Sequence, residues 1–230
     1  MAQFGNIKRV ERRIFPAVFV FLAGTCLSIP AAESIQPTDP NDGWKFVKES
    51  SGVTIYNRLR AGSRLKEFKA VGEIAAPTRA VNNVMDDREG YPTFMPYTTE
   101  CRLVGREADS ILTYQRLSPK ICADRDYTLR VHQKSWPMGN GLAYLDRWEP
   151  ANEHGPSEKP GVFRVKVCEG SWLLEPVGAG KTRGTYTIYT DSGVPVPAFI
   201  ANGISEMAIK KLFAAIRKQV KNPKYSVGEH

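Results

Sequence analysis

The sequence has little histidine, and this scarcity narrows the chemistry open to the protein. The histidines are His132, His154 and His230, and none stands at a metal-ligand spacing from a cysteine. The chain also lacks the Gly-x-Ser-x-Gly pattern that carries the serine nucleophile of many hydrolases. We therefore expect no metal, no cofactor and no catalytic residue.

Internal repeats and low-complexity tracts are also absent from the sequence. A chain of 230 residues, 42% of them hydrophobic, is long enough for one sizeable core and short for two. The basic residues behind the net charge of +8 are interleaved with acids, as in Asp124-Arg125-Asp126. A nucleic-acid-binding protein would gather them on one face, so we expect no nucleic-acid partner. A transient contact with an anionic membrane surface stays open, and we expect a monomer.

The first 32 residues have the layout of a secretory signal peptide. Four basic residues between positions 8 and 13 precede the apolar run 14–22, and small residues then lead to Ala32, after which we expect cleavage. The apolar run is short and contains Pro16, which disfavours the alternative of an uncleaved membrane anchor. The sequence therefore predicts an exported protein, periplasmic or secreted, with residues 33–43 as a polar linker.

Cysteine is sparse in the predicted mature chain, which keeps Cys101, Cys122 and Cys168. An odd number excludes a complete disulfide framework. An exported location would allow one bridge, whereas three buried or half-buried free cysteines are the simpler reading.

Alternating apolar residues predict that most of the chain forms β-strands. The joins between them are short and carry turn residues such as Asn140-Gly141, which favours antiparallel hairpins. The expected strands are 52–59, 65–74, 100–107, 110–117, 125–135, 142–150, 162–174 and 183–190.

Two segments have the spacing of helices. Residues 78–87 predict a short helix after Pro77. Residues 198–220 predict a long amphipathic helix, with Leu212, Ile216 and the cavity candidates named below on its apolar face. The order of elements predicts an α+β fold over 44–222, in which a long C-terminal helix crosses a curved antiparallel sheet, followed by a tail at 223–230.

A curved sheet cannot fill its own concavity, so the space beneath the helix packs solid or holds a ligand. The parity of side chains along the strands assigns an apolar inner face with a few polar groups, which suits a bulky apolar molecule. Glu169 continues the inner parity of its strand, at the strand end or as a ligand contact. The predicted ligand-binding residues are Gln115, Tyr127, Leu129, Val131, Phe163, Val165, Val167, Glu169, Ile200, Ile204, Met207 and Ala208.

Several segments, taken in order, resemble the START family of lipid-transfer domains over residues 44–220. Arg125-Asp126-Tyr127 matches the Arg-Asp-aromatic motif of that family at the start of a central strand. The other matching segments are Trp44 with 52–56 (GVTIY), 68–72 (FKAVG), 161–165 (GVFRV) and 185–197, the last strand and the turn into the final helix.

The resemblance implies a helix-grip fold with an internal lipid cavity closed by the C-terminal helix. Family members bind sterols, phospholipids, ceramides or other apolar ligands, and most are not enzymes. Sterol carriers of the family have an acid and an arginine in the cavity where this sequence has Gln115 and Val131. The resemblance therefore implies a lipid ligand, but not a sterol held by that charged pair.

Two alternatives to a lipid carrier remain. The first is a cyclase-like or hydrolase-like enzyme that uses the same cavity, with Glu169 as the candidate acid or base. The second is a module with a solid core that binds a partner protein.

Overall fold

The structure is a computed structural model that describes residues 43–63, 65–120, 123–178, 180–191 and 198–226, without the side chains of 198–202 and 204. The predicted signal peptide, and residues 33–42 of the predicted linker, lie outside the described residues. None of the helices in the described part of the chain combines the length and the hydropathy needed to cross a membrane.

A ten-stranded sheet forms the domain, and its order is β1-β2-β3-β10-β9-β7-β6-β5-β4, with β8 beside β6. All pairings are antiparallel except the parallel one between β6 and β8. The strands are β1 Lys45–Ser50, β2 Val53–Leu59, β3 Lys66–Ile74, β4 Thr98–Arg106, β5 Ser110–Leu117, β6 Asp124–Met138, β7 Gly141–Pro150, β8 Val162–Arg164, β9 Val167–Pro176 and β10 Thr182–Asp191.

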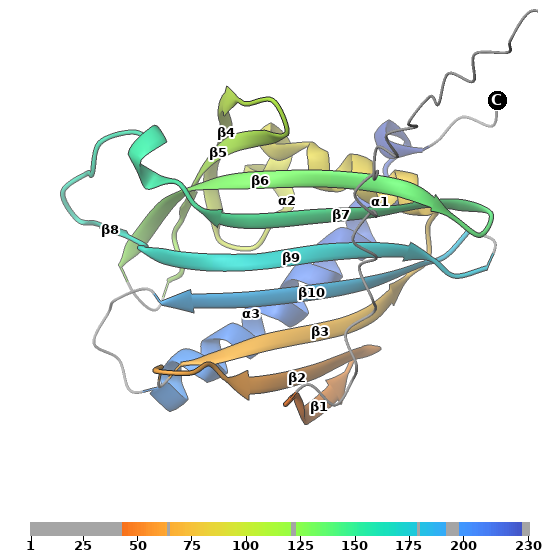
Figure 1. The fold of residues 1–230 in the computed structure, drawn as a ribbon, viewed down its shortest axis with the longest axis horizontal. Coiled ribbons are helices and arrows are strands. Elements are labelled where there is room, and N and C mark those ends of the chain that lie inside the picture. The colour runs from red at the N-terminus through yellow and green to blue at the C-terminus, as the bar shows by residue number, and fades with distance from the viewer. Residues whose placement is uncertain (1–42, 64, 121–122, 179, 192–197, 227–230) are drawn as a thin grey trace, which may run out of the picture. The chain divides into compact units, whose positions relative to one another are not determined.

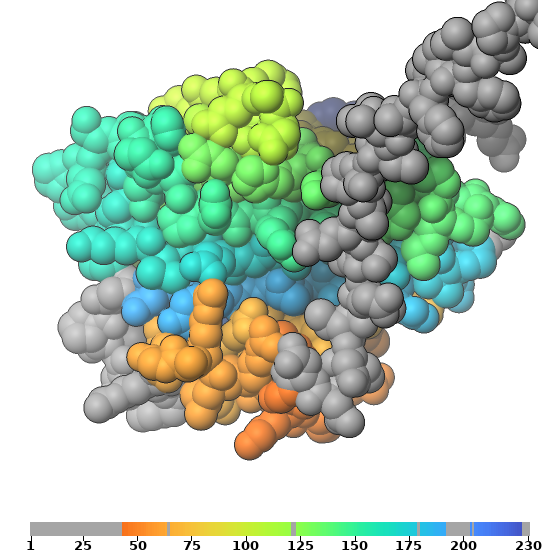
Figure 2. Space-filling view, in the orientation of Figure 1, coloured from red at the N-terminus to blue at the C-terminus, as the bar shows by residue number. Residues whose placement is uncertain are grey.

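Helices cover one face of this sheet, and α3 (Ala198–Gln219) crosses it from end to end (Figure 1). The short helices α1 (Thr78–Asp86) and α2 (Tyr91–Phe94) lie on the same face, joined by the 3-10 turn η1 (Arg88–Gly90). Two further 3-10 turns are η2 (Asn152–His154) and η3 (Pro223–Tyr225). Figure 2 shows the opposite face, on which the strand residues drawn in colour lie at the surface. The predicted helix-grip arrangement is confirmed.

The C-terminal half of α3 is packed directly onto the sheet. Ile209, Phe213 and Ile216 are buried, and the Phe213 ring lies 5.1 Å from that of Trp172. A Cβ on Gly72 would come within 3.0 Å of the Phe213 ring, so a glycine in β3 lets the helix approach this closely. This half of the apolar face predicted from residues 198–220 therefore packs into the core.

One predicted strand, 162–174, is wrong as a single element. The structure divides it into β8 and β9 at residues 165–166, because β8 pairs with β6 whereas β9 pairs with β7 and β10. The break changes the alternation of side chains, so the parity read from Phe163 does not continue into β9. This shift has consequences for the site.

A buried ion pair fixes the junction between β6 and β8. Arg164 donates from Nε to Asp126 Oδ1 at 2.7 Å and from Nη2 to Asp126 Oδ2 at 3.2 Å. The Tyr114 hydroxyl donates to the same carboxylate at 3.0 Å, and burial followed by this hydrogen bond raises the pKa of Tyr114 to about 12. The aspartate of the Arg-Asp-aromatic motif is therefore structural, since it joins three strands.

The folded chain continues past residue 222, where the sequence predicts the domain to end. Tyr225 in η3 is buried, and its hydroxyl donates to Asp87 Oδ2 at 2.5 Å. Lys224 Nζ donates to the same oxygen at 2.7 Å. Burial opposes the charge on Asp87, but these two bonds outweigh it and lower the pKa of this carboxyl. The predicted tail therefore begins too early, because its first residues are anchored below α1.

Candidate functional site

A cavity of about 360 Å³ lies between the inner face of the sheet and α3. Residues of the sheet, of α1, of α2 and of the middle of α3 line it. Met207 lines the cavity and is 53% exposed, so the cavity reaches the surface beside this residue. The cavity argues against the alternative of a module with a solid core beneath the helix.

Seven of the twelve predicted ligand-binding residues line this cavity. They are Gln115, Tyr127, Leu129, Val131, Val165, Met207 and Ala208. The parity argument worked for β5 and β6 because both strands are unbroken over these positions. Two other predicted residues, Ile200 and Ile204, have side chains outside the described residues.

Phe163, Val167 and Glu169 are not among the lining residues, so their predicted inward orientation is wrong. Because the chain bends at 165–166, Cys168 takes the inward position instead. Glu169 lies on the outer face, where its carboxylate pairs with Arg60 at 2.6 Å. This placement removes the residue that the enzyme alternative used as its candidate acid or base.

Aromatic side chains from three adjacent strands form the floor of the cavity. Trp148 of β7, Trp172 of β9 and Tyr186 of β10 all line it. The Tyr186 ring lies 4.8 Å from Trp172 and 5.9 Å from Trp148. A Cβ on Gly170 would come within 2.5 Å of the Trp148 ring, so this glycine leaves the space that the indole fills. These three aromatic residues were not among the predicted ligand-binding residues, although the alternation of side chains along their strands could have indicated them.

A buried ion pair lies among the lining residues at the inner end of the cavity. Arg88 Nη2 donates to Asp146 Oδ2 at 3.1 Å, and the two side chains are 12% and 9% exposed. Gln133 Nε2 donates to the same carboxylate at 3.2 Å. Burial raises the pKa of Asp146 against the opposing effects of Arg88 and Gln133. Arg88 Nε is buried and has no hydrogen-bond partner among the described residues, so the guanidinium retains a donor for a ligand.

The register of the strands places this pair deep in the molecule. Asp146 is opposite Trp172, which is opposite Tyr186 in β10. Tyr186 lies five residues before Asp191, the last residue of β10, and at about 3.3 Å per residue this separation is roughly 16 Å. A polar group held by Arg88 would therefore be far from the end of the cavity that Asp191 lines.

A second, uncharged polar group lies on β5 and β6. The Tyr127 hydroxyl donates to Gln115 Oε1 at 3.0 Å, and Gln115 Nε2 donates to Thr98 Oγ1 at 2.9 Å. Burial raises the pKa of Tyr127 well above its ordinary value, so the phenol is neutral at physiological pH. Gln115 thus has hydrogen-bond partners within the protein, rather than acting as the isolated polar contact that the sequence suggested.

The charged residues that line the cavity balance in sign. They are Arg88 and Arg125, which are positive, and Asp146 and Asp191, which are negative. The two positions that hold an acid and an arginine in sterol carriers are Gln115 and Val131 in this chain. The cavity nevertheless contains an acid and an arginine on other elements, Asp146 and Arg88. No sequence pattern indicated Arg88, because a turn residue between two short helices has no periodicity that assigns its side chain a direction.

Two observations concern the metal-ligating and thiol side chains of the described residues. Within the described ranges, no group of His, Cys, Asp and Glu side chains is arranged to hold a metal ion. Cys101 and Cys168 are buried free thiols, and burial raises the pKa of each to about 12. Cys122 lies outside the described residues.

Comparisons with known proteins agree with this geometry. A family model described as "Polyketide cyclase / dehydrase and lipid transport" matches residues 74–217. An uncharacterized protein of Pseudomonas aeruginosa is 28% identical over 70% of this chain and 78% of its own length. Phosphatidylcholine transfer protein of Mus musculus is 24% identical over 83% of this chain and 90% of its own.

The fold is likewise that of a solved lipid-transfer protein. A STAR-related lipid transfer protein from Xanthomonas axonopodis superimposes with a TM-score of 0.68 at 24% identity. The match covers 79% of this chain and 100% of the other. The START resemblance found in the sequence is therefore confirmed.

Proposed function

Because the chain belongs to the polyketide cyclase / dehydrase and lipid transport family, we propose that it is a carrier that encloses one polar lipid beneath α3. The observation that carries this proposal is a largely apolar cavity with a buried Arg88–Asp146 pair at its inner end. The apolar walls bind acyl chains, at about 25 cal/mol per Å² of surface removed from water. The ion pair orients the head of the lipid.

The balance of charges favours a lipid with no net charge. An anionic headgroup would leave one buried negative charge in excess, which is costly at low dielectric. A zwitterionic phospholipid instead offers a phosphate to Arg88 and an ammonium group to Asp146. Phosphatidylcholine, the lipid named for the mouse relative, has this pattern of charges.

Binding a two-chain lipid requires the cavity to widen. Its volume of about 360 Å³ is near the lower limit for drug-sized ligands. The C-terminal half of α3 is immobilised by its buried residues, and by Arg217, which donates to the backbone oxygens of Ser51, Gly52 and Glu73. In the part of α3 that precedes Ile209, a side-chain contact joins Glu206 to Lys48. The N-terminal half is therefore the part that opens.

Native mass spectrometry of the purified protein, with organic extraction, tests the carrier function. We expect one bound species of lipid mass per protein monomer, and uptake of phosphatidylcholine from vesicles after that lipid is stripped. A protein that is empty and takes up no lipid would contradict the proposal. It would favour the enzyme alternative, for which Asp146 and Tyr127 are two candidates among the titratable groups that line the cavity.

Headgroup recognition is tested by removing both members of the ion pair. In the double variant Arg88→Met/Asp146→Leu, no unpaired charge is left behind, so the fold should persist. We expect phosphatidylcholine uptake to fall about tenfold or more, since a charge-assisted hydrogen bond is lost. Uptake of diacylglycerol, which lacks the headgroup, should be unchanged.

An exposed ion pair provides the matched control for this variant. Arg102→Met/Glu100→Leu removes a pair at 3.1 Å on the surface of β4 and should leave both uptakes unchanged. If phosphatidylcholine and diacylglycerol uptake fell together in the cavity variant, the cavity would have collapsed and headgroup recognition would be refuted.

We also propose that the carrier is exported and works outside the cytoplasm. The basic, apolar and small-residue order of positions 1–32 supports this location. Mass spectrometry of the protein recovered from the periplasm of producing cells should show an N-terminus at Glu33. A full-length chain that stays with the membrane fraction would instead indicate an uncleaved anchor.

A further inference from the structure

The turn between β2 and β3 is basic and has an exposed leucine. The nine residues 58–66 contain no acidic residue. Leu59, at the end of β2, is 67% exposed, although large apolar side chains are usually covered. An open groove of about 710 Å³ runs beside this hairpin, and its charged lining residues are Lys45, Arg58, Arg60, Lys66 and Glu67. The groove is therefore lined by four basic residues and one acidic residue.

The position of the hairpin connects it to the cavity. Leu65, which precedes β3, lines the lipid cavity together with Met207 and with Asp191 at the end of β10. Figure 1 shows β3 beginning at the end of the sheet where β10 finishes and α3 starts. The basic hairpin therefore lies at the end of the cavity that Leu65 and Asp191 line.

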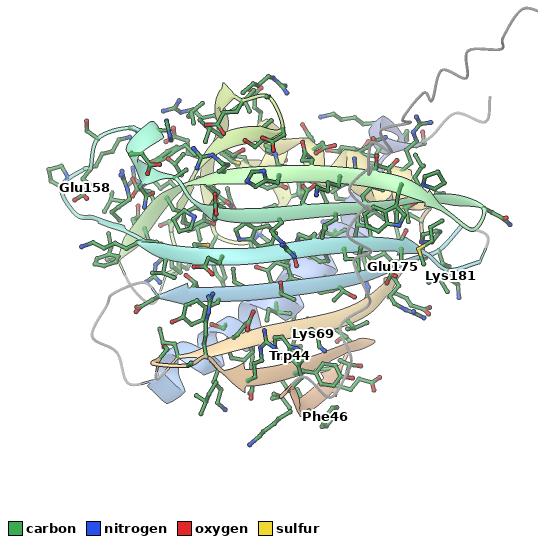
Figure 3. All side chains as sticks on the ribbon, in the orientation of Figure 1. Trp44, Phe46, Lys69, Glu158, Glu175 and Lys181 are labelled. Carbon is green, nitrogen blue, oxygen red and sulfur yellow. The ribbon has the colours of Figure 1, made fainter. Side chains whose placement is uncertain are left out.

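The cations of the hairpin differ in how they are neutralised. Arg58 Nε donates to Glu67 at 2.7 Å, and its guanidinium lies over the Trp44 ring at 4.4 Å. Figure 3 shows Trp44 beside Lys69 at this edge of the sheet. Arg60 pairs with Glu169. Among the described residues Lys66 has no ion-pair partner, so it remains available to an external anion.

We propose that the β2–β3 hairpin docks the protein on an anionic bilayer, with Leu59 entering the interface and Lys66 and its neighbours contacting lipid phosphates. This proposal rests on the proposed carrier function and assigns the place where the carrier meets a membrane. An apolar tip within a basic surface is the combination that binds anionic interfaces. Docking here brings the end of the cavity that Leu65 and Asp191 line close to the lipid that enters it.

Vesicle sedimentation of the full chain tests this surface. The probes are vesicles of phosphatidylcholine alone, and of phosphatidylcholine with one fifth phosphatidylglycerol as the anionic component. We expect the wild-type protein to bind the anionic vesicles more tightly, and to lose the difference at high salt because the Debye length shortens. The double variant Leu59→Asp/Lys66→Glu should bind the anionic vesicles about tenfold more weakly.

The opposite end of the sheet supplies a control with the same change in charge and polarity. Met138, 39% exposed at the end of β6, and Lys181, whose side chain is 59% exposed, lie in the hairpins that lead into β7 and β10. Figure 3 shows Lys181 at the end of the sheet away from the start of β3. Met138→Asp/Lys181→Glu should keep wild-type binding to anionic vesicles.

Equal binding to both kinds of vesicle, or an equal loss in the two double variants, would overturn the proposed docking surface. Lipid content, measured on the same samples by native mass spectrometry, separates this failure from failure of the carrier function. A loaded protein that ignores the anionic vesicles refutes only the docking surface. A protein that never holds lipid refutes the function on which the surface depends.

Discussion

Replacing Arg164 with methionine should lower the free energy of unfolding by about 3–5 kcal/mol, the usual cost of removing one partner of a buried ion pair. The substitution leaves the carboxylate of Asp126, 1% exposed, without its cation. At 2–4 °C per kcal/mol for a domain of this size, the melting temperature should fall by about 10 °C. Thermal unfolding followed by circular dichroism measures both quantities.

Arg116 is the matched control, because it pairs with Asp124 on the same strand as Asp126. Its side chain and that of Asp124 are each 30% exposed, and their contact is 2.7 Å. Arg116→Met should cost less than about 1 kcal/mol, as exposed pairs do. Equal destabilisation by both substitutions would show that burial of the Arg164–Asp126 pair does not determine its importance.

Replacing Ala208 with tryptophan should nearly abolish lipid loading while the domain stays folded. Ala208 lines the cavity from the middle of α3, so an indole at this position occupies space that the lipid needs. Binding would then require a bulky side chain to be expelled, and we expect loading to fall tenfold or more. Native mass spectrometry with phosphatidylcholine vesicles measures the loading. Met207 is a weaker choice, because a side chain that is 53% exposed can turn outward.

Ala214 provides a control on the same helix. It is exposed and is not among the residues that line the cavity, so Ala214→Trp adds the same side chain on the solvent side. Loading should equal that of the wild-type protein. Full loading of the Ala208 variant, measured beside this control, would contradict a cavity closed by α3.

The sequence by itself determined most of the strands, the helices α1 and α3, and the type of fold. Strand alternation and helical spacing are local properties, and β5 follows the predicted range 110–117 without change. The long amphipathic helix at the end of the chain had to bury one face, and the sheet offered the matching surface. For unbroken strands the same alternation also assigned the cavity, which is why Gln115, Tyr127 and Val131 were found.

Only the tertiary structure decided what depends on residues far apart in the chain. Arg88 and Asp146 are separated by 58 positions, and their pairing follows from how η1 sits against β7. Cys168 points inward and Glu169 outward because the chain bends between β8 and β9. The bend arises because β8 pairs with β6, whereas β9 pairs with β7. Local patterns assign side chains to faces within one strand, whereas strand partners and packed elements determine where a strand breaks and which charges meet.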